Sequence, residues 1–218
     1  MIAINEKPKR PSEVFGDGYD DFVSCKKRYR ICKGSRGSKK SKTTALNLIY
    51  RIMKYPEANA LCVRRYANTL RNSVYSDLKW AIHRIGVDDF FNCTVSPMEI
   101  SYTNKYGKIQ KILFRGLDDG LKITSISVDQ GVLCWVWIEE AYEITNEDDF
   151  NKLDLSIRGE VPEGCFKQIT MTFNPWSATS WLKARFFDTP DEDTFTKTTT
   201  WQCNECCLLY TSDAADDL

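Results

Sequence analysis

Gly34-Ser-Arg-Gly-Ser-Lys-Lys-Ser41 is the stretch of sequence that decides the fold. Its small and basic residues suit a loop in which consecutive backbone N–H groups turn inward onto an anion. A phosphate-binding loop of the pattern G-x-x-x-x-G-K-[ST] also needs a lysine that neutralises the β- and γ-phosphates and a hydroxyl that holds Mg²⁺. Gly34, Lys40 and Ser41 occupy these three positions, whereas Lys39 stands where the second glycine belongs. The stretch therefore predicts a nucleotide site with one departure from the pattern.

Lys39 matters for the backbone of the loop, because glycine at this position usually permits a conformation in which a Cβ atom is costly. Gly37, two residues earlier, relieves only part of that cost. If the loop forms, we expect the nucleotide to contact the whole stretch and the residue after it. These candidate binding residues are Gly34, Ser35, Arg36, Gly37, Ser38, Lys39, Lys40, Ser41 and Lys42. The alternative for the stretch alone is an ordinary glycine and serine turn in a basic loop.

The segments around the loop supply the context that such a motif requires. Residues 28–33 alternate polar and apolar side chains, which predicts a strand that runs into Gly34, and residues 41–54 carry apolar side chains at helical spacing. Further elements follow in alternation along the chain. Strands are predicted at 58–64, 109–114, 133–138 and 167–173, and helices at 69–85, from 147 onward and at 180–187. This alternation predicts an α/β fold with three layers and a mainly parallel central sheet.

An apolar strand that ends in two acids is the second motif. Residues 133–138 are apolar throughout, as expected of a strand buried on both faces, and Glu139 and Glu140 follow directly. The carboxyl ends of parallel strands form the edge at which open α/β sheets bind ligands. We assign Glu139 to Mg²⁺ and Glu140 to the attacking water. Because neighbouring strand residues point to opposite faces, both acids reach one site only if the chain turns at this edge.

Charge is unevenly distributed along a chain whose formal net charge is zero. Residues 1–85 carry 19 Lys and Arg against 7 Asp and Glu, a net charge of +12, and residues 86–218 carry 11 against 23, a net charge of −12. Nine cations and no acid lie between Lys26 and Lys42. Such a field suits polyphosphate or a nucleic-acid backbone. The alternative is a solvated basic face.

The composition is that of an ordinary globular protein, with 42% hydrophobic and 28% charged residues. The longest uncharged apolar run, residues 132–138, is too short to span a membrane, and the first ten residues contain no secretory signal, so we expect a cytosolic protein. Of the nine cysteines, the six scattered ones are expected in that compartment to be small buried hydrophobes: Cys25, Cys32, Cys62, Cys93, Cys134 and Cys165. Trp135 and Trp137, on the apolar strand, are expected in the core rather than as platforms for stacking bases.

Several short blocks of sequence occur in an order that is known from one family. They are Lys33–Lys42, Val63-Arg64, Asn68–Val74, Phe114–Asp119, Lys122–Ile126, Trp137–Ala141, Thr172–Pro175, Trp181–Lys183 and Thr199–Trp201. Over residues 26–205 this series resembles the ATPase half of phage terminase large subunits of the PBSX-like kind. Several blocks in the right order are far more specific than either nucleotide motif alone.

The resemblance implies a P-loop NTPase of the ASCE type, which uses ATP and Mg²⁺ to package double-stranded viral DNA into a procapsid. Such proteins work as a homo-oligomeric ring on the portal protein, with a terminase small subunit, in the cytoplasm of the infected bacterial host. The strand of the third motif is then expected between the phosphate-loop strand and the strand of the paired acids. Asn174 would report loss of the γ-phosphate to the DNA-gripping parts, and Arg36 would stabilise transition-state charge.

The sequence divides into an N-terminal arm at residues 1–24, the ATPase domain at 25–205 and an atypical, non-native tail at 206–218. Family members continue into a nuclease domain with metal-binding acids, which this chain does not reach, so we expect no DNA cleavage. Two alternatives stay open. One is a remnant that binds nucleotide or DNA without hydrolysis, because of Lys39 and the missing domain. The other is a helicase-like ATPase, which would need further motifs.

Overall fold

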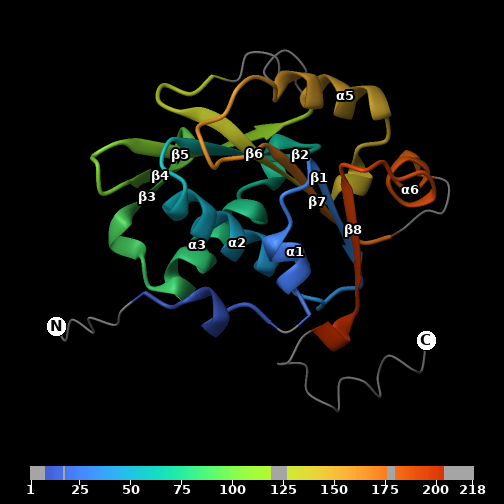
Figure 1. Cartoon of the computed structure of the whole chain (residues 1–218), viewed down its shortest axis with the longest axis horizontal. Helices are drawn as coiled ribbons and strands as arrows, with labels where there is room; N and C mark the ends of the chain where they lie inside the picture. The colour runs from blue at the N-terminus through green and yellow to red at the C-terminus, as the bar shows by residue number, and fades with distance from the viewer. Residues whose placement is uncertain (1–7, 17, 119–126, 176–179, 204–218) are drawn as a thin grey trace.

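A computed structural model of the chain describes residues 8–16, 18–118, 127–175 and 180–203. Its centre is an eight-stranded sheet (Figure 1) with the strand order β3-β4-β5-β2-β6-β7-β1-β8. The strands are β1 Tyr29–Gly34, β2 Ala58–Arg64, β3 Phe91–Val95, β4 Met98–Thr103, β5 Ile109–Gly116, β6 Val132–Glu139, β7 Gln168–Phe173 and β8 Thr194–Thr199. Strands from β5 to β8 in this order pair in parallel, and β3, β4 and β5 pair antiparallel. The expected mainly parallel sheet is confirmed.

Helices cover both faces of the sheet (Figure 1). The α-helices are α1 Asp20–Ser24, α2 Lys40–Lys54, α3 Val74–Ile85, α5 Glu147–Ser156 and α6 Trp181–Lys183, and α6 continues into the π-helical turn η5 Ala184–Asp188. Short 3₁₀ turns are η1 Pro11–Glu13, η2 Ala67–Thr69, η3 Asp88–Phe90, η4 Ala141–Glu143 and η6 Trp201–Cys203. None of the helices in the described part of the chain has the length and apolar character of a membrane span.

Strand β6 joins the two hydrophobic cores that these layers enclose. Trp135 and Trp137 pack with the side chains of α2 and α3, whereas Val136 and Ile138 pack with those of α5 and η5. All four are nearly or fully buried, so β6 is covered on both faces, and the two tryptophans are core residues. The expected three-layer α/β fold is therefore confirmed.

The order of the central strands brings the sequence motifs together. Strand β7 lies between β6 and β1, as the resemblance implied. In the register of these parallel strands Glu139 is level with Thr172, and Lys33 is level with Phe173. The residues that follow β1, β6 and β7 therefore meet at one edge of the sheet.

Some elements differ from their sequence-based prediction. Helix α3 begins at Val74 rather than at residue 69, because Ala67–Thr69 forms a 3₁₀ turn. Leu70 nevertheless packs in the core, so the apolar stripe extends beyond the helix. Strands β3, β4 and β8 had no sequence prediction. Helix α5 begins as expected, since the Asn146 side chain accepts a hydrogen bond from the Asp148 N–H.

The described part of the N-terminal segment packs closely against the domain. Tyr19 and Phe22 are fully buried and form a third apolar cluster with Cys32 of β1. The Tyr19 hydroxyl donates a hydrogen bond to the carbonyl oxygen of Ser38, in the phosphate-loop sequence. This segment thus supports the loop. Residues 206–218 lie outside the described residues.

Candidate active site

The loop between β1 and α2 has the backbone conformation that the glycine pattern predicts. Gly37 has a φ of 76°, and Lys39 has φ 63° and ψ 5°, in the left-handed region that costs a residue with a Cβ atom about 1–2 kcal/mol. The Lys39 carbonyl oxygen accepts a hydrogen bond of 2.8 Å from the Thr43 N–H, which closes the first turn of α2. Lys39 therefore adopts the conformation of the expected glycine and carries its cost.

Strand β8 lies next to β1 in the sheet and contacts the loop that follows β1. A Cβ atom on Gly34 would overlap with the side-chain and carbonyl oxygens of Thr199, so only glycine fits there. The Ser35 N–H donates to the Thr199 carbonyl oxygen at 3.2 Å, and the Thr199 hydroxyl bonds the hydroxyl of the buried Ser38 at 3.0 Å. The close approach of Thr199 therefore requires glycine at position 34, whether or not a ligand binds.

Helix α2 points its N-terminus at the loop. The first N–H groups of a helix have no partner within the helix, and the helix dipole adds partial positive charge there. The first turn of α2 contains no acid, and its sequence begins with Lys40, Ser41 and Lys42. A helix N-terminus that follows such a loop has the chemistry to bind phosphate groups.

Lys40 connects the loop with the two other motifs. Its side chain is mostly buried, and its ammonium group donates to Oδ1 of Asn174 at 2.5 Å and to the Ser35 carbonyl oxygen at 3.3 Å. Burial lowers the pKa of Lys40, and the carboxylates of Glu140 and Glu139 act in the opposite direction. The lysine, the asparagine and both acids therefore lie in one electrostatic neighbourhood.

The chain turns where the two acids need it to turn. Strand β6 ends at Glu139, and Glu140 has φ 49° and ψ 50° at the start of η4. Alternation along an extended strand would place the two carboxylates on opposite faces. The left-handed residue breaks that alternation, which allows both side chains to act near Lys40.

Glu139 is 8% exposed and lies among other charges. Burial, and then the neighbouring Glu140 carboxylate, raise the pKa of Glu139 to about 7, against the opposing effect of Arg64. Nε of Arg64 lies 3.3 Å from Glu139 Oε2, and Nη2 of the same arginine lies 2.6 Å from Glu143 Oε1. Arg64, the last residue of β2, therefore forms ion pairs with one carboxylate at the end of β6 and another in η4.

The carboxylate oxygens of these acids are chemically suited to a Mg²⁺ ion. One carboxylate oxygen each of Glu139, Glu140 and Glu143 is buried and accepts no hydrogen bond from the described residues, although the one of Glu139 forms the ion pair with Arg64. Carboxylate and hydroxyl oxygens are the ligands that Mg²⁺ prefers, and this ion usually takes one or two carboxylates together with substrate phosphates. The described residues contain no group of three or more His, Cys, Asp or Glu that could hold a metal ion.

The other candidate residues occupy different surroundings. Ser41 is the second residue of α2 and is half-buried, and Arg36 is exposed in the loop. The Lys42 ammonium group pairs with Asp77 of α3 at 2.8 Å and lies 4.3 Å from the centre of the Trp80 ring. The side chain of Lys42 is therefore engaged with α3, while its backbone stays in the first turn of α2.

Arg64, Thr199 and Tyr19 contribute to the site without having been candidates. Arg64 had a usable signal, because it ends a predicted strand at the same sheet edge as the acids. Thr199 stands in one of the blocks that carry the family resemblance, but its contacts with the loop arise from the packing of β8. Tyr19 had no signal, since its contact depends on the packing of the segment before α1.

Comparisons with known proteins agree on one family. The family model described as "Phage terminase large subunit" matches residues 26–214. The terminase large subunit of Bacillus phage SPP1 is 34% identical over 146 residues, which are 66% of this chain and 34% of that protein. The PBSX phage terminase large subunit of Bacillus subtilis (strain 168) is 28% identical over 170 residues, 78% of this chain and 36% of that protein. This chain thus spans about a third of the length of either relative.

The large terminase of the thermophilic bacteriophage D6E has a similar structure. Its TM-score is 0.72 at 19% identity, over 89% of this chain and 45% of that chain. The complex of the same protein with ATP-γ-S gives a TM-score of 0.69, also at 19% identity, over 89% of this chain and 44% of that chain. At this identity the likeness establishes a shared fold.

Proposed function

Because this chain belongs to the family of phage terminase large subunits, we propose that it is the ATPase motor part of such a subunit. It hydrolyses ATP and couples hydrolysis to the movement of double-stranded DNA into a procapsid. The observation that carries the proposal is the contact of Lys40 with Asn174 beside the acids of β6, at the edge where the phosphate loop lies. Three motifs far apart in sequence converge there.

The backbone of the loop and the first turn of α2 bind the phosphates in this proposal. Their N–H groups face an anion at the helix N-terminus, and Lys40 lies against the β- and γ-phosphates. Lys40 is already partly desolvated, so a phosphate group replaces Asn174 as its main partner at small cost. Arg36, exposed on the loop, is free to approach the transferring phosphoryl group as its charge develops.

Glu139 and the hydroxyl of Ser41 are the residues that would hold Mg²⁺. When bound, the ion would neutralise charge on the phosphate oxygens. Glu139 is well suited to receive a cation, because its raised pKa reflects a buried carboxylate that lacks sufficient positive charge. Arg64 supplies part of that charge in the absence of nucleotide.

Glu140 is the proposed base of the reaction. It accepts a proton from a water molecule, the water oxygen attacks the γ-phosphorus, and the bond to the β-phosphate oxygen breaks to leave ADP and phosphate. Glu140 has a left-handed backbone, so its side chain does not continue the alternation of side chains along β6. Asn174 then regains its contact with Lys40 as the γ-phosphate leaves, and β7 carries that change into the sheet.

The cations of the N-terminal half are proposed to contact the DNA backbone without regard to sequence. By family, the assembly would be a homo-oligomeric ring that works with a portal protein and a terminase small subunit in the cytoplasm of the infected bacterial host. A nucleotide-binding protein that does not hydrolyse ATP is the second candidate, and Lys39 favours it, because this residue departs from the motif and holds a left-handed conformation at a cost.

Titration with a fluorescent ATP analogue tests the proposal. We expect binding that requires Mg²⁺ and that is lost in Lys40→Ala, since both the phosphate partner and the contact with Asn174 disappear. Lys105→Ala is the matched control, because Lys105 is an exposed lysine in the turn between β4 and β5. Binding that is equal in all three proteins, or that ignores Mg²⁺, would refute the proposed nucleotide site.

A further inference from the structure

Two cysteines lie in contact at the edge of the sheet opposite to the candidate active site. Cys134 belongs to the beginning of β6, and Cys165 lies three residues before β7 begins. Their sulfur atoms are 3.4 Å apart, and neither forms a disulfide. Cys134 is fully buried, whereas Cys165 is half-buried and is the more exposed of the two.

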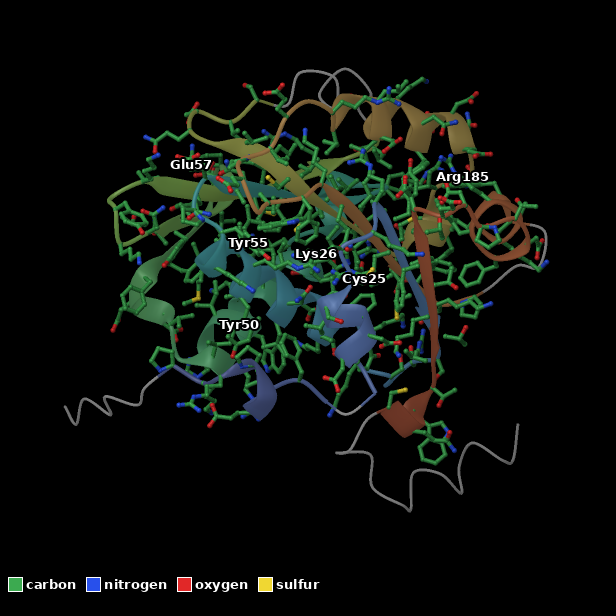
Figure 2. The ribbon with its side chains drawn as sticks, viewed as in Figure 1. Cys25, Lys26, Tyr50, Tyr55, Glu57 and Arg185 are labelled. Carbon is green, nitrogen blue, oxygen red and sulfur yellow. The ribbon has the colours of Figure 1, made fainter. Side chains whose placement is uncertain are left out.

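Positive charge lies around Phe166, the residue that follows Cys165. The neighbouring Phe166 lines a cavity of about 330 Å³ whose other lining residues include Lys26, Arg51 and Lys54 and no acid. Figure 2 shows Lys26 and Tyr55, both residues of this cavity, beside α1 and α2. The guanidinium group of Arg51 lies 4.9 Å from the centre of the Phe166 ring. Positive charge of this kind favours a thiolate over a thiol.

The two thiols differ in their readiness to ionise. The hydrogen bond with Cys134 lowers the pKa of Cys165 below its ordinary value, with help from the Phe166 backbone and Arg51 and against the effect of burial. The same hydrogen bond, together with burial, raises the pKa of Cys134. Cys165, the more exposed of the two thiols, is therefore also the more readily ionised, and Cys134 lies beside it as the second thiol.

We propose that Cys165 is a site of reversible oxidation by peroxides and that Cys134 resolves it as an intramolecular disulfide. The Cys165 thiolate attacks one peroxide oxygen, the O–O bond breaks, and a sulfenic acid and a hydroxide ion form. The Cys134 thiol then gives up its proton as its sulfur attacks the sulfenic sulfur, and the S–O bond breaks to release water. Two thiols lose two electrons in total, and one hydrogen peroxide becomes two water molecules.

The disulfide would join the beginnings of two strands that matter for the active site. Strands β6 and β7 pair directly, with Trp135 opposite Gln168, and their far ends carry Glu139 and lead to Asn174. The crosslink would fix the segment that enters β7 against β6, at the edge remote from the nucleotide. This proposal is independent of whether the chain hydrolyses ATP.

Peptide mapping by mass spectrometry tests the site on the wild-type chain. The reduced protein is treated with hydrogen peroxide, remaining thiols are blocked, and the digest is analysed without reduction. We expect a peptide pair that links Cys134 with Cys165 and that disappears after dithiothreitol. A digest in which Cys165 stays reduced, or is linked to another cysteine, overturns the proposal.

Three variants separate the roles of the two thiols. Cys134→Ser is expected to lose the crosslink and to accumulate a sulfenic acid on Cys165 that dimedone traps, whereas Cys165→Ser loses both products. Cys93→Ser is the matched control, because Cys93 lies on β3, four strands away from β6, and it should leave the crosslink unchanged. Dimedone labelling of Cys134 instead of Cys165 would contradict the assignment, and Cys134→Ala replaces Cys134→Ser if the buried hydroxyl impairs folding.

Discussion

Glu139 is a buried carboxyl group between a like charge and an arginine. Its pKa is about 7, above its ordinary value of 4.5. A raised carboxyl pKa means that the folded state prefers the protonated form. This group therefore supports folding fully below pH 4.5, and that contribution is lost as the pH rises through 7 in the absence of a bound cation.

The first prediction uses this residue. Glu139→Gln removes the titration, so the unliganded variant should lose less thermal stability than wild type between pH 5 and pH 8. Thermal unfolding at several pH values measures the difference, with Glu163→Gln as an exposed control. Identical pH profiles of wild type and Glu139→Gln would show that the pKa of Glu139 is not raised in the folded state.

The second residue-scale prediction concerns Lys39. Lys39→Gly should raise the free energy of unfolding of the unliganded protein by about 1 kcal/mol, because glycine adopts the left-handed conformation without a Cβ penalty. Lys79→Gly is the matched control, since Lys79 is exposed within α3 and glycine there should lower stability by about 1 kcal/mol. Equal losses in both variants of a denaturant titration would contradict the strain at Lys39.

At the scale of elements, the edge strand β8 positions the phosphate loop through a close approach. Gly34→Ala should lower stability by about 1–3 kcal/mol and weaken nucleotide binding, because the new methyl group overlaps with Thr199 oxygens. Thr199→Ala should not rescue it, since the carbonyl oxygen stays in place. If Gly34→Ala had the melting temperature and nucleotide affinity of wild type, β8 would be able to move away from the new methyl group, and the close approach would not position the loop.

The sequence predicted those elements whose apolar pattern is strong. The loop, α2, β2 and β6 follow from glycine spacing and periodic apolar residues, and their bounds agree with the structure to within one residue. Strands β3, β4 and β8 lie at or near the sheet edges and keep exposed side chains, so they lack such a pattern. The ion pairs of Arg64 with Glu139 and Glu143 depend on strand order, which no local pattern contains.

At the scale of the whole molecule, charge separation along the chain sets the expected mode of DNA binding. Contacts to phosphates release counterions, so affinity for double-stranded DNA should fall by about 10³-fold or more between 50 and 200 mM salt if six or more phosphates are contacted. Fluorescence anisotropy with two duplexes of equal length and unrelated sequence measures this. A preference for one duplex, or affinity that does not change with salt, would exclude backbone-driven binding.

ATP hydrolysis by Glu140→Gln, measured together with nucleotide binding, tests the central claim most directly. Glutamine keeps the size of the side chain and cannot take a proton from water, so release of phosphate should be abolished while Mg²⁺-dependent ATP binding stays at the wild-type level. Wild-type turnover in the variant, or loss of binding together with hydrolysis, would contradict the proposed role of the acid after β6.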